Sequence, residues 1–313
     1  MLRSLDEVLE AIRGESMRRV SVAVADDESV LESIAETRKR GMADAILVGH
    51  EVRIREVAEK VGFDLRDTPI VHEPSPNRAS VRAASLVREN QADVLMKGHV
   101  HTDDFLRGVL DKEQGLRTGS IMSHVFLLDT KHLGRITMVT DGAMNIAPDL
   151  TTKAAIIMNA VYLAHLLGIE QPKVGILCAA ELVNPSMAAT LDAGALAQMS
   201  HRGQFPRCIV DGPLALDNAL SEVAARHKGI GGEVAGNCDI LLVPNIETGN
   251  VLAKSFTYLA RRLTAGVLVG AAAPVVLTSR ADSAESKMYS LATAMLMSHM
   301  RRDSRMKVGK VHF

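Results

Sequence analysis

The segment APVVLTSRADS, residues 273–283, joins an apolar run to the start of a helical pattern. The run Val275–Leu277 predicts a short buried strand, and the helix is expected from Ala284. The polar groups that end the strand are two hydroxyls, a guanidinium and a carboxylate, from Thr278, Ser279, Arg280 and Asp282. Ligands in open α/β sheets settle at the carboxyl ends of strands, and arginine holds phosphate or carboxylate through paired hydrogen bonds. The segment therefore predicts an anion site at a strand end, with a plain helix N-cap beside a solvated arginine as the alternative.

The same alternation of short apolar runs and longer amphipathic runs extends over the whole chain. It is typical of βαβ units and predicts an α/β fold with a mostly parallel sheet. The other strands are predicted at residues 20–25, 45–48, 70–71, 94–96, 174–177, 208–210, 240–243 and 267–269. The helices are predicted at residues 28–40, 51–61, 78–89, 103–110, 150–167, 186–199, 215–226, 251–262 and 284–299.

One region breaks this rhythm. Two apolar runs, residues 121–128 and 135–140, flank the turn-rich sequence DTKHLG, which indicates a hairpin rather than a crossover. The chain has 313 residues, and single cores usually divide at roughly 250–300 residues, so two domains are expected. We place a boundary near Asn145–Pro148, and the physical expectation is two α/β domains with a cleft between them.

Composition excludes several classes of partner. The net charge is −1, tryptophan is absent and 3% of residues are aromatic, so we expect neither nucleic acid nor an acidic membrane as a partner. The first residues lack the apolar region of a secretory signal. The longest apolar run, residues 265–277, is interrupted by Gly266, Gly270 and Pro274 and is too short to span a bilayer. The three cysteines are too evenly spaced for a zinc site and are expected to be buried, reduced thiols. These features favour a cytoplasmic protein.

Lys97 and Gly98 follow the predicted strand of residues 94–96. A lysine and a glycine at a strand end let a backbone approach an anion beside a positive charge. The second half of a P-loop is missing, and an exposed loop lysine is the alternative. His99 and His101 have no third ligand nearby, so no metal site is predicted.

Other strand ends carry polar groups of lower specificity. Arg107, one turn into its predicted helix, is expected to pair with Asp103 or to face an anion. The sequence PNIETGN, residues 244–250, places small and amide groups at a helix N-terminus. Asp-Gly and Gly-Pro at residues 141–142 and 211–213 predict turns that end strands. No glycine-rich dinucleotide motif follows the first strand, where Ala25-Asp26-Asp27 stands, so a classical NAD site is disfavoured.

In this order, these segments resemble the phosphate acetyltransferase/phosphate butyryltransferase family. The phrases AELVNP, VDGPLALD and VLTSRADS, at residues 180–185, 210–217 and 276–283, are like its butyryl branch. The acetyl branch usually carries a Ser-Thr-Lys-Gly-like loop where this chain has Ala179–Glu181. The matching segments are residues 93–98, 103–107, 115–123, 141–149, 211–217, 244–250 with Lys254, and 278–282.

The resemblance implies a fold of the isocitrate/isopropylmalate-dehydrogenase type with the active site in the cleft. One domain then comprises residues 1–146 and 271–313, the other residues 147–270, and a homodimer or a higher homo-oligomer is expected. The implied reaction interconverts acyl-CoA and phosphate with acyl phosphate and CoA, by direct attack of the CoA thiol. CoA and phosphate are then substrates, and no cofactor or metal is expected.

The resemblance also assigns roles to single residues. Ser279 and Arg280 match the family's Ser-Arg pair, and Arg107 matches its phosphate-side arginine. Further substrate-binding positions are expected at Lys97, Gly98, Asn250 and Lys254.

The general base stays open. In acetyl-type relatives an aspartate lies about two helical turns beyond the serine, but Ser286 stands there in this chain, with Glu285 adjacent. We favour Asp282, which shares the loop with Ser279 and Arg280, as the base.

Two other functions compete. A metal- and NAD-dependent dehydrogenase of the same fold needs clustered carboxylates, whereas Asp211, Asp217 and Asp239 are scattered. A non-catalytic module that binds acyl-CoA or acyl phosphate and regulates a partner has no need for the Ser-Arg pair together with Arg107. The acyl-chain length and the preferred direction are not readable from the residues.

Overall fold

The structure is a computed structural model that describes residues 1–302 and 309–311. Its contacts divide the chain into two compact units. Unit 2 comprises Leu5–Ser120 and the chain from Ala265 through the last helix, and unit 1 comprises Met1–Ser4, Ile121–Thr264 and the C-terminal residues 309–311. The units divide after residues 120 and 264, whereas the predicted domains divide after residues 146 and 270. The predicted domain boundaries stay a prediction.

The strands of unit 2 stand in the order β3-β2-β1-β4-β11-β10. The first five are parallel, and β10 runs antiparallel to β11. This confirms the predicted mostly parallel sheet in this unit. The strands are β1 (Arg18–Ala23), β2 (Ala43–Gly49), β3 (Ile70–His72), β4 (Val94–Lys97), β10 (Thr264–Val269) and β11 (Val275–Val276).

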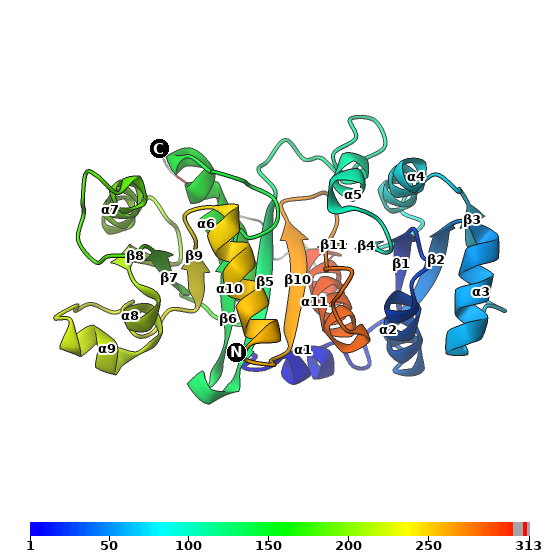
Figure 1. Cartoon of the computed structure of the whole chain (residues 1–313), viewed down its shortest axis with the longest axis horizontal. Coiled ribbons are helices and arrows are strands. Elements are labelled where there is room, and N and C mark those ends of the chain that lie inside the picture. The colour runs from blue at the N-terminus through cyan, green and yellow to red at the C-terminus, as the bar shows by residue number, and fades with distance from the viewer. Residues whose placement is uncertain (303–308, 312–313) are drawn as a thin grey trace. The chain divides into compact units, whose positions relative to one another are not determined.

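Helices cover both faces of these strands. α2 and α11 pack against each other, with α3 beside α2, and α4 packs against α5 on the opposite face (Figure 1). The helix α1, which the sequence pattern did not predict, packs on α11. The helices of unit 2 are α1 (Leu5–Ala11), α2 (Glu28–Lys39), α3 (Glu51–Val61), α4 (Pro76–Arg88), α5 (Thr102–Val109) and α11 (Ala284–Arg302).

This order creates a topological switch point between β1 and β4. The chain leaves β1 into α2 on one face and leaves β4 into α5 on the other, so the two connections diverge. Loops that diverge at neighbouring strand ends leave a crevice at the carboxyl edge of the sheet, which is where open α/β sheets bind ligands.

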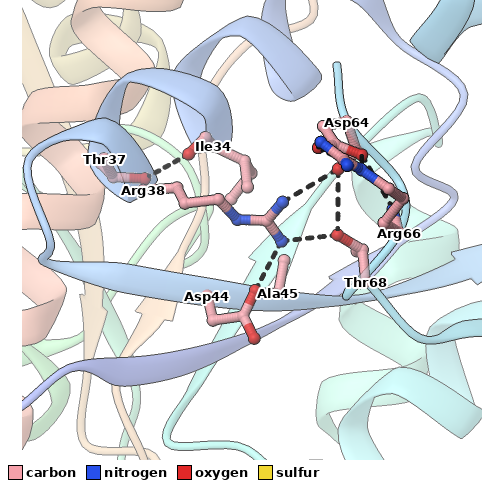
Figure 2. Close-up of polar contacts among 8 residues, drawn as sticks. All are labelled: Ile34, Thr37, Arg38, Asp44, Ala45, Asp64, Arg66 and Thr68. Carbon is pink, nitrogen blue, oxygen red and sulfur yellow. Dashed lines mark hydrogen bonds and ion pairs between the residues drawn. The ribbon is translucent and has the colours of Figure 1, made fainter.

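The opposite, amino edge of unit 2 is closed by Arg38 at the end of α2. Its guanidinium donates to Asp44 Oδ1 at 2.6 Å, to Thr68 Oγ1 at 2.5 Å and to the Asp64 carbonyl at 2.9 Å (Figure 2). The same group stacks 5.0 Å from the ring centre of Phe63. One side chain thus ties α2, the start of β2 and the loop before β3 together.

Unit 1 has the strand order β5-β6-β9-β7-β8. β5 and β6 form the predicted antiparallel hairpin, and the remaining pairs are parallel. Its strands are β5 (Ser123–Thr130), β6 (Arg135–Thr140), β7 (Lys173–Leu177), β8 (Ile209–Leu214) and β9 (Ile240–Leu242). Its helices are α6 (Leu150–Leu166), α7 (Ala188–His201), α8 (Leu216–Leu220), α9 (Glu222–His227) and α10 (Ile246–Tyr258), with the 3₁₀ turn η1 (Lys131–Leu133) inside the hairpin.

Three sequence predictions are wrong in unit 1. The residues Asp211-Gly212-Pro213 do not end a strand, because β8 continues through them to Leu214. The helix expected at residues 215–226 is broken at Ser221, whose hydroxyl accepts from Ala224 N and caps α9. The helix expected from residue 251 begins earlier, at Ile246, because Asn245 caps it.

No helix within the described ranges is both long enough and apolar enough to span a membrane.

Candidate functional site

The switch point of unit 2 gathers the residues that the sequence pattern singled out at strand ends. Asp26 and Asp27 follow β1, Lys97 ends β4 and precedes Gly98, and the turn of residues 278–283 follows β11. Since β1, β4 and β11 are adjacent and parallel, these groups share one carboxyl edge. The residues expected at the strand-end anion site therefore lie at one edge of the sheet; they are Lys97, Gly98, Ser279, Arg280 and Asp282.

Gly98 lets β4 end tightly against the end of β1. A Cβ at this position would lie 2.2 Å from the Val24 carbonyl oxygen and 2.6 Å from that of Ala23, so no other residue fits without moving backbone. The amides of Gly98 and His99 donate to those same two carbonyls, at 2.9 and 2.7 Å. Val24 itself has φ of 55°, a costly conformation for a β-branched residue. The glycine thus fixes the backbone on which Lys97 stands.

Lys97 is buried, with 2% of its surface exposed, so the alternative of an exposed loop lysine is wrong. Its Nζ makes one long contact, 3.4 Å to the Gly98 carbonyl. The pKa of Lys97 is lowered to about 8, chiefly by burial and also by the positive charges of Arg280 and Lys287, against the opposing effect of Asp27 and Asp282. An anion bound beside Lys97 would stabilise its charged form, which is the chemistry of a phosphate or carboxylate site.

The turn after β11 is folded around its own polar groups. Asp282 Oδ2 accepts from Ser279 N at 2.8 Å, and Asp282 N donates to the Ser279 carbonyl at 3.2 Å. Ser283 Oγ accepts from Ser286 N at 3.2 Å and so serves as the N-cap of α11. Ser283 is therefore the helix cap. Ser279 Oγ accepts one long bond, from Ala281 N at 3.4 Å, and its hydroxyl can still donate to another group. Ser279 and Arg280 are both exposed.

Two buried polar atoms near these strand ends have no hydrogen-bond partner within residues 1–302 and 309–311. They are Thr278 Oγ1, on a residue 6% exposed, and Asp26 Oδ1. A buried polar group is normally paired, so each of these atoms is available to a ligand or to an ordered water. Thr278 is one of the groups of the predicted anion site, whereas Asp26 was not predicted to take part in it.

Arg107 lies on α5 with 71% of its side chain exposed. It donates to Asp104 Oδ1 at 2.8 Å, one turn back, so the pairing with Asp103, one of the two alternatives expected for it, is not formed. A surface pair of this kind is worth little, so the guanidinium is easily redirected to an anion. Its role in phosphate binding stays a prediction.

Asn250 and Lys254 belong to unit 1. Asn250 Nδ2 donates to the Gly142 carbonyl at 3.2 Å and so joins the start of α10 to the loop after β6. That loop is fixed by the buried Asp141, whose carboxylate accepts from the amides of residues 143–145. Lys254 is exposed on α10. The Asn245 side chain caps the helix by accepting from Thr248 N at 3.0 Å, so the expected polar-ligand site at this N-terminus is partly filled by the chain itself.

The cysteines are free thiols, as predicted, although Cys178 is half-buried rather than buried. Burial raises the pKa of Cys178 to about 11 and the pKa values of Cys208 and Cys238 to about 12. At neutral pH all three are protonated and therefore poor nucleophiles. The described ranges contain no group of three or more His, Cys, Asp or Glu residues placed to hold a metal ion.

Lys287 is the site residue that sequence reasoning missed. It lies in the first turns of α11, is 2% exposed, and donates to the carbonyls of Asp282 at 2.6 Å and Ser279 at 3.3 Å. Burial lowers its pKa, opposed by Asp27 and Asp282. The one available signal was its helical spacing, because Lys287 shares a face with the buried Leu291 and Ala294, where a lysine is unusual.

Comparison with known proteins places this chain in a family. The family model described as "Phosphate acetyl/butaryl transferase" matches residues 4–79 and 69–295, nearly the whole chain. The protein belongs to this family, as the resemblance of its strand-end segments predicts.

Individual relatives agree with this assignment. A phosphate butyryltransferase of Clostridium acetobutylicum is 52% identical over 95% of this chain and 99% of its own length. A phosphate acetyltransferase of Rhizobium meliloti is 41% identical over 95% of this chain and 94% of its own length. The butyryl branch therefore provides a nearer relative than this acetyl-branch protein.

Solved structures confirm the fold class. A branched-chain phosphotransacylase from Enterococcus faecalis V583 matches with a TM-score of 0.77 and 35% identity, over 90% of this chain and 99% of that one. A 4-hydroxythreonine-4-phosphate dehydrogenase from Klebsiella pneumoniae matches with a TM-score of 0.54 and 13% identity, over 90% and 99% of the two chains. The second likeness concerns the fold alone and agrees with the predicted dehydrogenase-like α/β architecture.

The lowered pKa of Lys97 makes a prediction for stability. In the folded protein this pKa is about 8, below the ordinary 10.5, so the unfolded chain binds more protons between these values and stability rises with pH through this window. Lys97→Met carries no such proton. At pH 7 the free energy of unfolding of this variant should exceed that of the wild type by roughly 1–3 kcal/mol. This difference should shrink toward pH 10.5.

Urea denaturation of both proteins at pH 7 and pH 10 measures the difference. Lys39→Met, at an exposed position on α2, is the control and should show no such pH dependence. A stability difference for Lys97→Met that is equal at the two pH values would contradict the lowered pKa.

Proposed function

We propose that this protein transfers a short-chain acyl group between CoA and phosphate, interconverting acyl-CoA plus phosphate with acyl phosphate plus CoA. Family membership and the likeness to proteins named phosphate butyryltransferase and phosphate acetyltransferase support this reaction. The observation that carries it lies at the switch point of unit 2, where Lys97 is buried without an ion pair among the described residues and Arg280 is exposed beside it. Such a cluster suits a phosphoryl group.

The proposed chemistry is a direct transfer in a ternary complex. In the direction that makes acyl-CoA, the CoA sulfur attacks the carbonyl carbon of the acyl phosphate, the C–S bond forms, and the C–O bond to phosphate breaks. The thiol proton passes to a carboxylate base, and the phosphate leaves as an anion. A thiol with a pKa near 8.5 needs modest help to ionise, so a nearby carboxylate suffices. No acyl group is attached to the protein.

Ser279 and Arg280 are proposed as donors to the tetrahedral oxyanion and the leaving phosphate, with Lys97 and Arg107 on the phosphate side. The close approach at Gly98 supports a role for its backbone, and Asn250 and Lys254 of unit 1 are proposed to bind CoA or phosphate. These assignments rest on the exposure of Ser279 and Arg280 and on the buried charge of Lys97.

Asp282 is proposed as the base. One of its oxygens, Oδ2, holds Ser279 N, while Oδ1 has no hydrogen-bond partner among the described residues and is left for the thiol proton. Glu285, exposed in the first turn of α11, is the alternative.

A butyryl-type preference follows from the nearer relative in that branch.

We also propose a cytoplasmic location, with which the three free thiols agree, and a homodimer or a higher homo-oligomer. Exposed apolar side chains on and just after α10, among them Val251 and Leu259, support self-association. Light scattering that gives the mass of a single chain would contradict an oligomer.

The activity is tested by thiol release from acetyl-, propionyl-, butyryl- and isobutyryl-CoA in the presence of phosphate. We expect phosphate-dependent release, with kcat/KM about tenfold higher for butyryl- than for acetyl-CoA, because each buried methylene contributes about 0.8 kcal/mol. Arg280→Ala should lower kcat/KM by about 10²- to 10³-fold, since it removes an oxyanion donor. Arg55→Ala, an exposed arginine on α3, is the matched control and should stay within about twofold of wild type.

Two outcomes would replace this proposal. Binding of butyryl-CoA without release at saturating phosphate would favour the non-catalytic module. EDTA-sensitive reduction of NAD would favour the dehydrogenase.

The base is tested by pH–rate profiles of two variants. Asp282→Asn should lower kcat by about 10²- to 10⁴-fold, because it removes the proton acceptor while its amide oxygen can still accept from Ser279 N. Glu285→Gln should retain the wild-type profile. The reverse pattern, with the acidic limb lost in Glu285→Gln alone, would move the base to Glu285.

A further inference from the structure

Lys287 ties the turn that carries Ser279 and Arg280 to the body of α11. Its ammonium donates to two carbonyls, those of Ser279 and Asp282, which flank the exposed Arg280. One buried group therefore holds both ends of the segment from which the proposed donors project.

The turn has little else to hold it. The other hydrogen bonds described for residues 279–282 join members of the turn to one another: Ser279 N to Asp282 Oδ2, Asp282 N to the Ser279 carbonyl, and Ala281 N to Ser279 Oγ at 3.4 Å. Such bonds shape the turn but do not fix it to the sheet or to the helix. Among the described contacts, the two from Lys287 alone connect these backbone carbonyls to a side chain of α11.

A lysine is a costly way to make this connection. Burial disfavours its charged form, and its surroundings contain another buried cation, Lys97, as well as the carboxylates of Asp27 and Asp282. An apolar residue would suit the fold better at a position that shares a face with Leu291 and Ala294. A group kept at such cost points to a role outside stability.

We propose that Lys287 is a positioning residue of the acyl-transfer site, which acts by clamping the Ser279 and Asp282 carbonyls so that the side chains of Ser279 and Arg280 face the reacting group. The inference rests on the proposed function for the identity of the reaction. Lys287 itself touches backbone oxygens and takes no part in bond making. A donor displaced by about 1 Å can cost about 10²-fold in rate, so loss of the clamp should appear in kcat.

The test uses Lys287→Met, which keeps the length of the side chain but cannot donate, and Lys287→Arg, which can. Lys153→Met is the matched control: Lys153 is also buried, but it pairs with Asp192 on α7 of unit 1. We expect Lys287→Met to lose about 10- to 100-fold in kcat, with KM for acyl-CoA changed by less than about threefold, and Lys287→Arg to recover part of that loss. Lys153→Met should lose thermal stability but keep its kcat per folded molecule.

Hydrogen exchange separates this inference from the proposed function. In Lys287→Met, exchange at the Ala281 and Asp282 amides should rise about tenfold, whichever substrate the protein uses. If exchange rises but the wild type transfers no acyl group, the proposed function fails and the clamp stands. If Lys287→Met is folded and both its exchange and its kcat match wild type, the inference is overturned. Should Lys287→Met fail to fold, Lys287→Gln is measured in the same way and decides by the same results.

Discussion

The carboxyl edge of unit 2 is built around a buried lysine that forms no ion pair among the described residues. Lys97 ends β4, and its ammonium makes one long contact, with the neighbouring carbonyl. Removing such a charge from water is expensive, which is why its pKa lies near 8 rather than 10.5. The cost is tolerable because the backbone beneath Lys97 is fixed by Gly98 against the end of β1, a contact that only glycine permits. An anion bound in the crevice would offset the desolvation cost of the Lys97 charge. This residue therefore links the fold to the proposed chemistry.

Three neighbouring strands supply the rest of the edge, and each does so with a short polar segment. β1 contributes Asp26 and Asp27, β4 contributes Lys97, and β11 contributes the turn that begins at Thr278. The turn is the least secured of the three, because its own hydrogen bonds are internal and its link to α11 runs through Lys287. The carboxylates keep two buried cations and an exposed arginine from standing uncompensated.

Much of this was readable from the sequence. The alternation of apolar and amphipathic runs predicted the strands, the hairpin and most helices, because period and turn residues are local properties. The strand-end positions of Lys97, Ser279 and Arg280 were predicted for the same reason. That these strand ends are neighbours was not predicted, because the pairing of β11 with β4 depends on strand order, which no local pattern shows. The contact of Lys287 with the turn spans five to eight residues, but it depends on a side-chain direction that apolar periodicity does not reveal. In unit 1, Gly212 and Pro213 read as a turn but lie inside β8, at the point where its register with β7 shifts.

Titration of Lys97 is the most direct test of an anion site at this strand end. In protein labelled with ¹⁵N at lysine side chains, the Lys97 signal is assigned by its absence from Lys97→Arg and followed against pH with and without inorganic phosphate. The apparent pKa of Lys97 should be about 8 in the free protein and should rise toward 10.5 as phosphate saturates, because a bound anion favours the charged ammonium. A pKa that does not move at saturating phosphate would contradict an anion site at this strand end.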